Sequence, residues 1–218
     1  HGSPTQYTEH CKYFASRGIV AATADYRVIS RNNTTAIECV KDAKTCMRWI
    51  RVNADSLGVD ANKIIMGGGS AGGFLCLAAA INDPEFEEST DSKNISCVPD
   101  AMVLINPVVN SEEFEFRVKK FPGKAADVNP LTHVKNNLPP AIAFHGTADE
   151  MSAFKFVEKF VDDYKKNGNE IELHSYDGME HGFAQMNKND GKYYKETLRL
   201  TDEWLTKKGY LTGNPTIN

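Results

Sequence analysis

The chain has 218 residues, of which 41% are hydrophobic and 25% charged, so we expect one medium-sized globular domain over residues 1–218. Its 25 Lys and Arg against 29 Asp and Glu give a net charge of −4, which disfavours a nucleic-acid or anionic-membrane partner. No apolar run approaches the roughly 18 residues of a membrane span, and five cysteines without C-x-x-C spacing disfavour zinc ribbons and dense disulfide frameworks. The composition therefore predicts a soluble globular protein.

Short β-branched apolar runs alternate with longer helical stretches, which is typical of an α/β protein with a largely parallel sheet. The first helix is predicted over 4–17, and a second, long one begins after Thr34 or Thr35, either of which can cap it. Further helices are predicted over 71–81, 152–167 and 192–208. Buried strands are predicted over 19–24, 63–66, 101–105, 141–144 and 170–176.

Two stretches lack a clear period. A polar loop is expected over 85–94, and residues 106–140 are predicted to be an irregular insertion that serves as a lid or binding loop. Three prolines break this insertion, at Pro107, Pro122 and Pro130. Its aromatic residues either line an acyl or aryl pocket or anchor the insertion to the core, and the sequence favours neither alternative: Phe114, Phe116 and Phe121.

The segment Gly68-Gly69-Ser70-Ala71-Gly72 matches G-x-S-x-G and lies between a predicted strand and a predicted helix. A serine at such a turn projects its hydroxyl above the sheet, so Ser70 is predicted to be a nucleophile. Glycine is expected to be required at Gly68 and Gly72, because a Cβ at either position would collide with the neighbouring strand or helix. The alternative is a phosphate-binding turn, but the segment lacks both the G-x-G-x-x-G order and the Walker lysine. Ala71, at the start of the helix, is predicted to donate its N–H to an oxyanion.

A serine nucleophile needs a base, and the base needs an orienting acid. In this topology the acid and then the histidine follow later strands. Asp149 follows the strand over 141–144 and is the predicted acid, with Glu150 as its main rival and Asp177 as a weaker one. His181 follows the strand over 170–176 and is the predicted base.

Two further histidines are predicted to have roles outside the reaction. His145, at a strand end, is predicted to hold the Asp149 loop, and His10 reads as a solvated helix residue. No metal site and no cofactor are predicted, because histidines and carboxylates do not recur at metal-binding spacing. Gly69 and Phe183 are predicted to contact the substrate.

The chain resembles an α/β-hydrolase of the hormone-sensitive-lipase-like esterase group, close to acetyl-esterase and acetylxylan- or feruloyl-esterase-like members. The resemblance rests on Asp25-Tyr26-Arg27, on residues 60–73, on His145-Gly146-Thr147-Ala148-Asp149 and on residues 178–183. It implies the α/β-hydrolase fold, with a mostly parallel sheet and helices on both faces. It also implies a serine carboxylesterase that cleaves small-molecule, short-chain acyl esters through a covalent acyl-enzyme, including acetyl or feruloyl esters of carbohydrates.

One segment departs from the pattern of this group. Its members carry His-Gly-Gly-Gly after an early strand, whereas here His1-Gly2 is followed by Ser3-Pro4. The resemblance therefore implies an N-terminally incomplete domain without the glycine loop that supplies further oxyanion donors, so this chain would have reduced activity. An uncovered sheet edge would also favour a homodimer.

Two alternatives from other classes remain. A serine peptidase of the oligopeptidase type shares the fold and the triad, but such enzymes usually carry a large additional domain, which 218 residues do not supply. The second alternative is a catalytically impaired or non-catalytic hydrolase-fold module.

Overall fold

The computed structural model describes residues 3–217, with the backbone alone for residues 116–118. The chain divides into two compact units. The larger unit is Arg27–Gly182, and the smaller one joins the segment that ends at Tyr26 to the segment that begins at Phe183.

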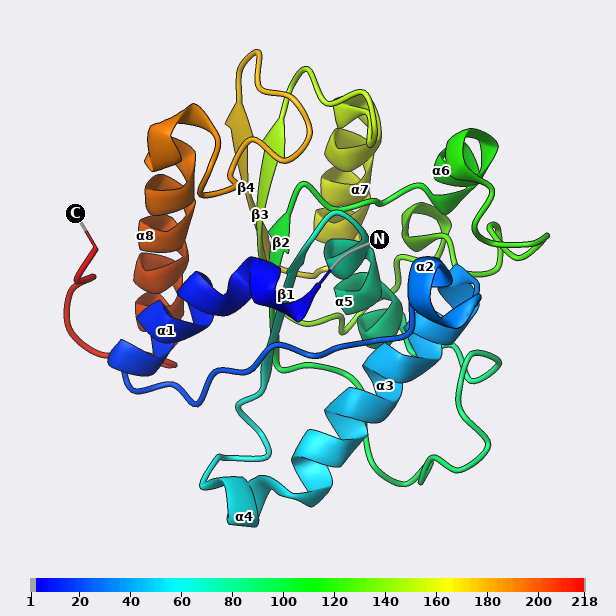
Figure 1. The fold of residues 1–218 in the computed structure, drawn as a ribbon, viewed down its shortest axis with the longest axis horizontal. Coiled ribbons are helices and arrows are strands. Elements are labelled where there is room, and N and C mark those ends of the chain that lie inside the picture. The colour runs from blue at the N-terminus through cyan, green and yellow to red at the C-terminus, as the bar shows by residue number, and fades with distance from the viewer. Residues whose placement is uncertain (1–2, 218) are drawn as a thin grey trace. The chain divides into compact units, whose positions relative to one another are not determined.

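A four-stranded sheet in the order β1-β2-β3-β4 forms the centre of the larger unit (Figure 1). Every neighbouring pair of strands is parallel, so each connection crosses over through helical or loop structure. The prediction of an α/β protein with a mostly parallel sheet is therefore confirmed. The strands are β1 (Ile65–Gly69), β2 (Ala101–Ile105), β3 (Ala141–Gly146) and β4 (Ile171–Tyr176).

Helices α5 and α7 pack on the sheet and form the main core with it. Leu77 of α5 and Phe160 of α7 are each 1% exposed and belong to one hydrophobic cluster with Met102 and Leu104 of β2. All six residues of β3 are buried, as expected of a parallel strand that is covered on both faces. The helices of this unit are α2 (Ile29–Asn32), α3 (Ala36–Val52), α4 (Ala54–Leu57), α5 (Ala71–Ile81), α6 (Ser111–Val118), the 3₁₀-helix η2 (Pro130–Thr132) and α7 (Phe154–Lys166).

Helix α3 begins with a capping box. The Thr35 hydroxyl accepts from the Ile37 N–H at 3.2 Å, and the Glu38 carboxylate accepts from the Thr35 N–H at 2.8 Å. Thr35 rather than Thr34 is therefore the cap, and two N–H groups of the first turn are satisfied.

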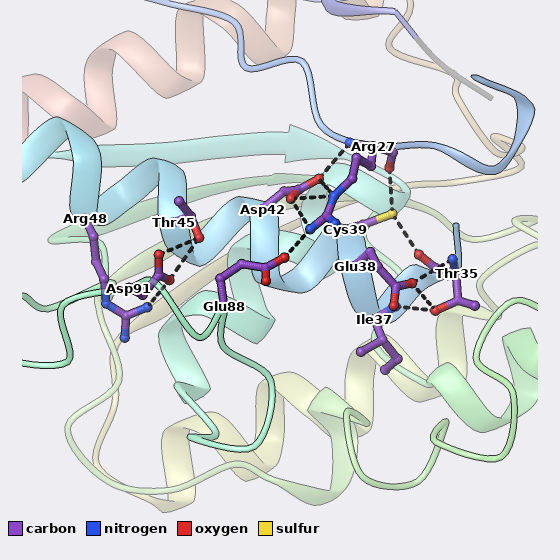
Figure 2. Close-up of polar contacts among 10 residues, drawn as sticks. All are labelled: Arg27, Thr35, Ile37, Glu38, Cys39, Asp42, Thr45, Arg48, Glu88 and Asp91. Atoms are coloured by element: carbon purple, nitrogen blue, oxygen red, sulfur yellow. Dashed lines mark hydrogen bonds and ion pairs between the residues drawn. The ribbon is translucent and has the colours of Figure 1, made fainter. Parts of the chain in front are cut away.

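Charged side chains of α3 hold the polar loop that follows α5 (Figure 2). Arg48 of α3 donates to Asp91 in that loop at 2.9 Å, and both side chains are nearly buried. Nearby, Arg27 bridges Asp42 of α3 and Glu88 of the loop. A buried ion pair is costly to break once formed, so the Arg48–Asp91 pair fixes the path of a segment that has no regular structure, and the half-buried Arg27 contacts add to it.

The prediction of a buried strand over 19–24 is wrong. In the described chain these residues belong to no strand, and Val20 is 62% exposed. A β-branched run has the propensity for a strand, but a strand exists only where a neighbouring ladder accepts its N–H and C=O groups. The strand predicted over 63–66 also begins later than expected and continues through the glycines to Gly69.

The stretch over 106–140 is not irregular throughout, because it contains α6 and η2. Helix α6 begins after Asn110, whose side chain accepts from the Glu113 N–H at 3.3 Å, and two glutamates occupy its first turn. This asparagine followed by glutamates is a start signal that the periodicity argument overlooked.

The phenylalanines of this stretch are described in part. Phe121 is 2% exposed and meets the ring of Phe74 on α5 edge-on, with centroids 5.3 Å apart. Phe114 in turn packs on Phe121 at 6.4 Å. Phe121 therefore anchors the stretch to α5, while the side chain of Phe116 lies outside the described residues.

In the smaller unit, a buried carboxylate joins helix α1 (Thr8–Ser16) to helix α8 (Lys192–Lys207). Asp202 accepts from Arg17 Nε at 2.6 Å and from the Tyr13 hydroxyl at 2.6 Å. Two short 3₁₀-helices, η1 (Pro4–Tyr7) and η3 (Asn189–Gly191), precede α1 and α8.

His10 of α1 is largely buried, which corrects the prediction of a solvated residue. Its ring lies between those of Tyr7 and Tyr194, with centroids 4.9 and 4.8 Å away. Both ring nitrogens are buried without a hydrogen-bond partner in the described chain. Burial lowers the pKa of His10 from 6.5 to about 4, so the folded protein holds this imidazole neutral.

This burial predicts a loss of stability in mild acid. Between pH 6.5 and about 4 the unfolded chain protonates His10 and the folded chain does not. The free energy of unfolding therefore decreases by about 3 kcal/mol as the pH is lowered over that range. His10→Phe keeps an aromatic ring between the two tyrosines and removes the titration. Urea unfolding at pH 7 and pH 4 should show this pH-dependent loss in the parent and a correspondingly smaller one in the variant; equal losses in both would contradict the assignment.

Candidate active site

Ser70 occupies the sharp turn between β1 and α5. Its φ of 54° and ψ of −114° are unfavourable for a residue with a Cβ atom, and its N–H donates to the Ile105 carbonyl at 2.9 Å. A Cβ at position 68 would lie 2.6 Å from the backbone of Gly72, so glycine is required there. Position 72 itself has open space, so the same prediction for Gly72 is wrong: the close approach is made by its backbone onto Gly68, not by its own missing side chain.

The structure brings Ser70, His181 and Asp149 into one chain of hydrogen bonds. Ser70 Oγ lies 2.8 Å from His181 Nε2, and Asp149 Oδ2 lies 2.7 Å from His181 Nδ1. All three residues belong to the larger unit and follow the carboxyl ends of β1, β4 and β3. The rival acids lie elsewhere: Glu150 is exposed, and Asp177 accepts from the Thr147 hydroxyl at 3.1 Å.

Asp149 is 4% exposed and its two oxygens face different donors. Oδ1 accepts from the backbone N–H groups of Met151 and Ser152, each at 2.9 Å, while Oδ2 faces His181. Burial by itself would raise the pKa of this carboxyl, but the hydrogen bonds from His181 and Ser152 outweigh that effect and hold the pKa below its ordinary value. The carboxylate is therefore ionised at neutral pH and oriented by the backbone.

His145 is fully buried at the end of β3 and contacts the same loop. Its Nε2 lies 2.8 Å from the Ser152 carbonyl and 3.3 Å from Asp149 Oδ2, and its ring stacks on that of Phe154. Burial lowers the pKa of His145, and the carbonyl contact requires the proton on Nε2. His145 thus links both ends of the Asp149 loop.

The other predicted site residues are more dispersed. Ala71 begins α5, so its N–H is one of the first-turn donors that have no acceptor within the helix. Gly69 ends β1. Phe183 belongs to the smaller unit and packs edge-on against Tyr193, with centroids 5.6 Å apart. His1 and Gly2 lie outside the described residues.

Asn106 is a site residue that the sequence reasoning missed. It directly follows β2, and its Nδ2 lies 3.4 Å from His181 Nε2. The available signal was its position, because a polar residue at the carboxyl end of a central parallel strand faces the crevice where α/β proteins bind ligands.

Gly146 holds the loop that carries His181. A Cβ at position 146 would lie 2.0 Å from the Met179 carbonyl oxygen, which also accepts from the Ala148 N–H at 3.1 Å. Gly146→Ala is therefore expected to lower the free energy of unfolding by about 3 kcal/mol, because a backbone segment must move. Gly72→Ala is the matched control in urea unfolding: it adds the same methyl group in open space and should not destabilise the protein. Equal stability of the two variants would contradict this packing.

A protein-family model and several solved structures match most of this chain. The model of the BD-FAE family matches residues 2–163. The chain belongs to the BD-FAE family. Thermogutta terrifontis esterase 2, solved after phosphorylation by paraoxon, superposes with a TM-score of 0.91 and 40% identity, over 98% of this chain and 80% of that one. The same esterase has been solved with bound propionate, at a TM-score of 0.90 and 40% identity, and with butyrate, at 0.91 and 38%; each match covers 98% of this chain and 81% of that one.

Curated relatives of this BD-FAE member are more distant and longer. Esterase LipC of Mycobacterium tuberculosis is 26% identical over 78% of this chain and 46% of its own length, and the probable carboxylic ester hydrolase LipM of the same organism is 29% identical over 71% and 39%. Endo-1,4-beta-xylanase B of Butyrivibrio fibrisolvens is 26% identical over 63% of this chain and 23% of that protein. The chain thus spans less than half the length of these relatives. Together with the parallel sheet, the structural matches establish the α/β-hydrolase fold.

None of the helices within residues 3–217 combines the length and apolar character needed to cross a bilayer. Among the described side chains, no three His, Cys, Asp or Glu residues gather in a way that could hold a metal ion.

Proposed function

We propose that this chain is a carboxylic ester hydrolase in which Ser70 is the nucleophile, His181 the general base and Asp149 the residue that orients His181. The observation that carries the proposal is the unbroken hydrogen-bond chain from Ser70 Oγ through the imidazole to Asp149 Oδ2, at 2.8 and 2.7 Å. The strained φ of Ser70 supports it, because such strain concentrates at functional sites. The names of the relatives support the same reaction.

In the proposed reaction, Ser70 Oγ attacks the ester carbonyl carbon while its proton passes to His181 Nε2. Asp149 keeps the other imidazole proton on Nδ1 and stabilises the cation that forms. The negative charge on the former carbonyl oxygen develops near the start of α5, where the Ala71 N–H and the helix dipole favour it. Collapse of the intermediate breaks the bond to the alcohol oxygen, which takes the proton from Nε2, and water then cleaves the acyl-enzyme.

Short acyl groups are the proposed substrate class. Thermogutta terrifontis esterase 2, which is about 40% identical to this chain, has been solved with bound propionate and with bound butyrate. Acetyl or feruloyl esters of carbohydrates are a second candidate, because one relative is a xylanase. Gly69 and Phe183 are retained as proposed substrate contacts, and the expected homodimer stays a prediction.

The test compares hydrolysis of p-nitrophenyl acetate and butyrate with that of methyl ferulate, acetylated xylan and an aminoacyl anilide. We expect the short p-nitrophenyl esters to be cleaved fastest, and a fluorophosphonate probe to label the peptide that contains Ser70. Faster cleavage of the anilide would indicate a peptidase instead. If no substrate is cleaved and no label attaches, the chain is a non-catalytic module.

A further inference from the structure

Strands β1 and β2 are neighbours, and each is followed directly by a non-glycine residue with a positive φ. In the register of β1 and β2, Gly69 pairs with Ile105, so Ser70 and Asn106 are the next residues of the two strands. Both have a positive φ, 54° for Ser70 and 38° for Asn106. Their side chains also reach the same atom, His181 Nε2, at 2.8 and 3.4 Å. An amide donor thus lies beside the nucleophile, next to the nitrogen that moves the proton.

The surroundings of Asn106 hold it in this place. It is 4% exposed, and its N–H donates to the Phe144 carbonyl at 2.7 Å. On the other side, the carbonyl of Pro107 accepts from the Ser152 hydroxyl at 2.8 Å. A residue kept in a sparsely populated conformation by contacts on both sides is typical of a functional site.

A turn alone does not account for Asn106. Asparagine tolerates a positive φ better than most residues, and Asn137, in the loop before β3, has a φ of 59°. Asn137, however, is exposed and lies at the amino end of the sheet, away from the triad. Burial and the direction of the amide toward Nε2 are what distinguish Asn106 from a simple turn residue.

We propose that Asn106 is a positioning residue for the hydrolysis of the acyl-enzyme, an inference that rests on the proposed function. Neutral imidazole has one lone pair on Nε2, and the Ser70 hydroxyl occupies it in the free enzyme. Once Ser70 Oγ is esterified, it has no proton to donate. The Asn106 amide remains beside Nε2, and because Nδ2 and Nε2 are 3.4 Å apart, one water can lie within hydrogen-bond distance of both atoms.

The water accepts a hydrogen bond from Asn106 Nδ2 and gives a proton to His181 Nε2 while its oxygen bonds to the acyl carbon. The resulting tetrahedral intermediate breaks its bond to Ser70 Oγ, which takes the proton back from Nε2. The products are the carboxylic acid and the free serine, and Asn106 exchanges no proton. Its role is to place the water, so it acts after acylation.

The experiment separates acylation from deacylation in a stopped-flow burst with p-nitrophenyl acetate. Asn106→Gly removes the amide and permits the positive φ, and Asn137→Gly makes the same change in an exposed turn. We expect Asn106→Gly to lower the deacylation rate constant about tenfold, the loss of roughly one hydrogen bond. The acylation rate constant should change less than about threefold, so kcat and KM fall together. Asn137→Gly should match the parent in both.

Equal falls in both rate constants would overturn the proposal, because Asn106 would then only hold His181. Unchanged rate constants would overturn it as well and leave Asn106 a turn residue. Circular dichroism and thermal melting check that each variant is folded, and Asn106→Ala, which removes the same amide, should give the same split. Failure of the proposed function looks different: the parent would release no p-nitrophenol above the uncatalysed rate, or Ser70→Ala would release it as fast as the parent.

Discussion

Ser70→Ala is expected to lower kcat for p-nitrophenyl butyrate by about 10⁶-fold. The loss should be this large because, in the proposed mechanism, Ser70 supplies the atom that forms the covalent intermediate, and its Oγ lies 2.8 Å from His181 Nε2. Steady-state kinetics on parent and variant, with fluorophosphonate labelling of both, measure the effect.

Ser70→Gly separates the chemistry from the backbone strain. Glycine adopts the φ of 54° and ψ of −114° without the steric cost that any Cβ imposes, so this variant should exceed Ser70→Ala in free energy of unfolding by about 1–2 kcal/mol. Both variants should be equally inactive. Activity that survives in either one would remove Ser70 from the mechanism, and equal stabilities would mean that the turn is not strained.

Local sequence signals predict much of the fold because the central strands and helices bury faces that their own residues define. Strand β3 is continuously apolar, and α5 follows the glycine motif directly, so pattern and structure agree there. The apolar run over 19–24 looks similar, but it would form a strand only if a neighbouring strand paired with it. The residues of the run do not specify that partner. His10 lies three residues after Tyr7 and four before Phe14, so the helical spacing places it on the apolar face. The prediction that it is solvated was wrong because it relied on the polarity of the side chain and not on this spacing.

The three residues of the candidate site were predictable because each of them follows a predicted strand in the chain. Ser70, Asp149 and His181 each follow a strand, and parallel strands bring their carboxyl ends to one edge. Asn106 follows a strand too, but no short motif surrounds it, and its aim at His181 depends on how the turn after β2 is held. The number of donors around Asp149 is likewise a property of the folded loop.

Asp149→Asn is expected to lower kcat by about 10⁴-fold with the fold intact. The amide oxygen must take the place of Oδ1, because the N–H groups of Met151 and Ser152 both donate there at 2.9 Å. The amide NH₂ then faces His181 Nδ1, 2.7 Å away in the parent, and can only donate to it. His181 would therefore carry its proton on Nε2, so it could not accept the proton of Ser70.

Glu150→Gln is the matched control, since it neutralises the adjacent carboxylate, which is exposed. It should keep the activity of the parent within about threefold, as surface changes away from a site usually have small effects. Thermal melting of both variants separates lost chemistry from lost structure. If Glu150→Gln were the inactive variant and Asp149→Asn the active one, the orienting acid would be misassigned. If both were active, His181 would reach its working tautomer without a carboxylate, and the hydrogen bond at 2.7 Å would serve the loop rather than the reaction.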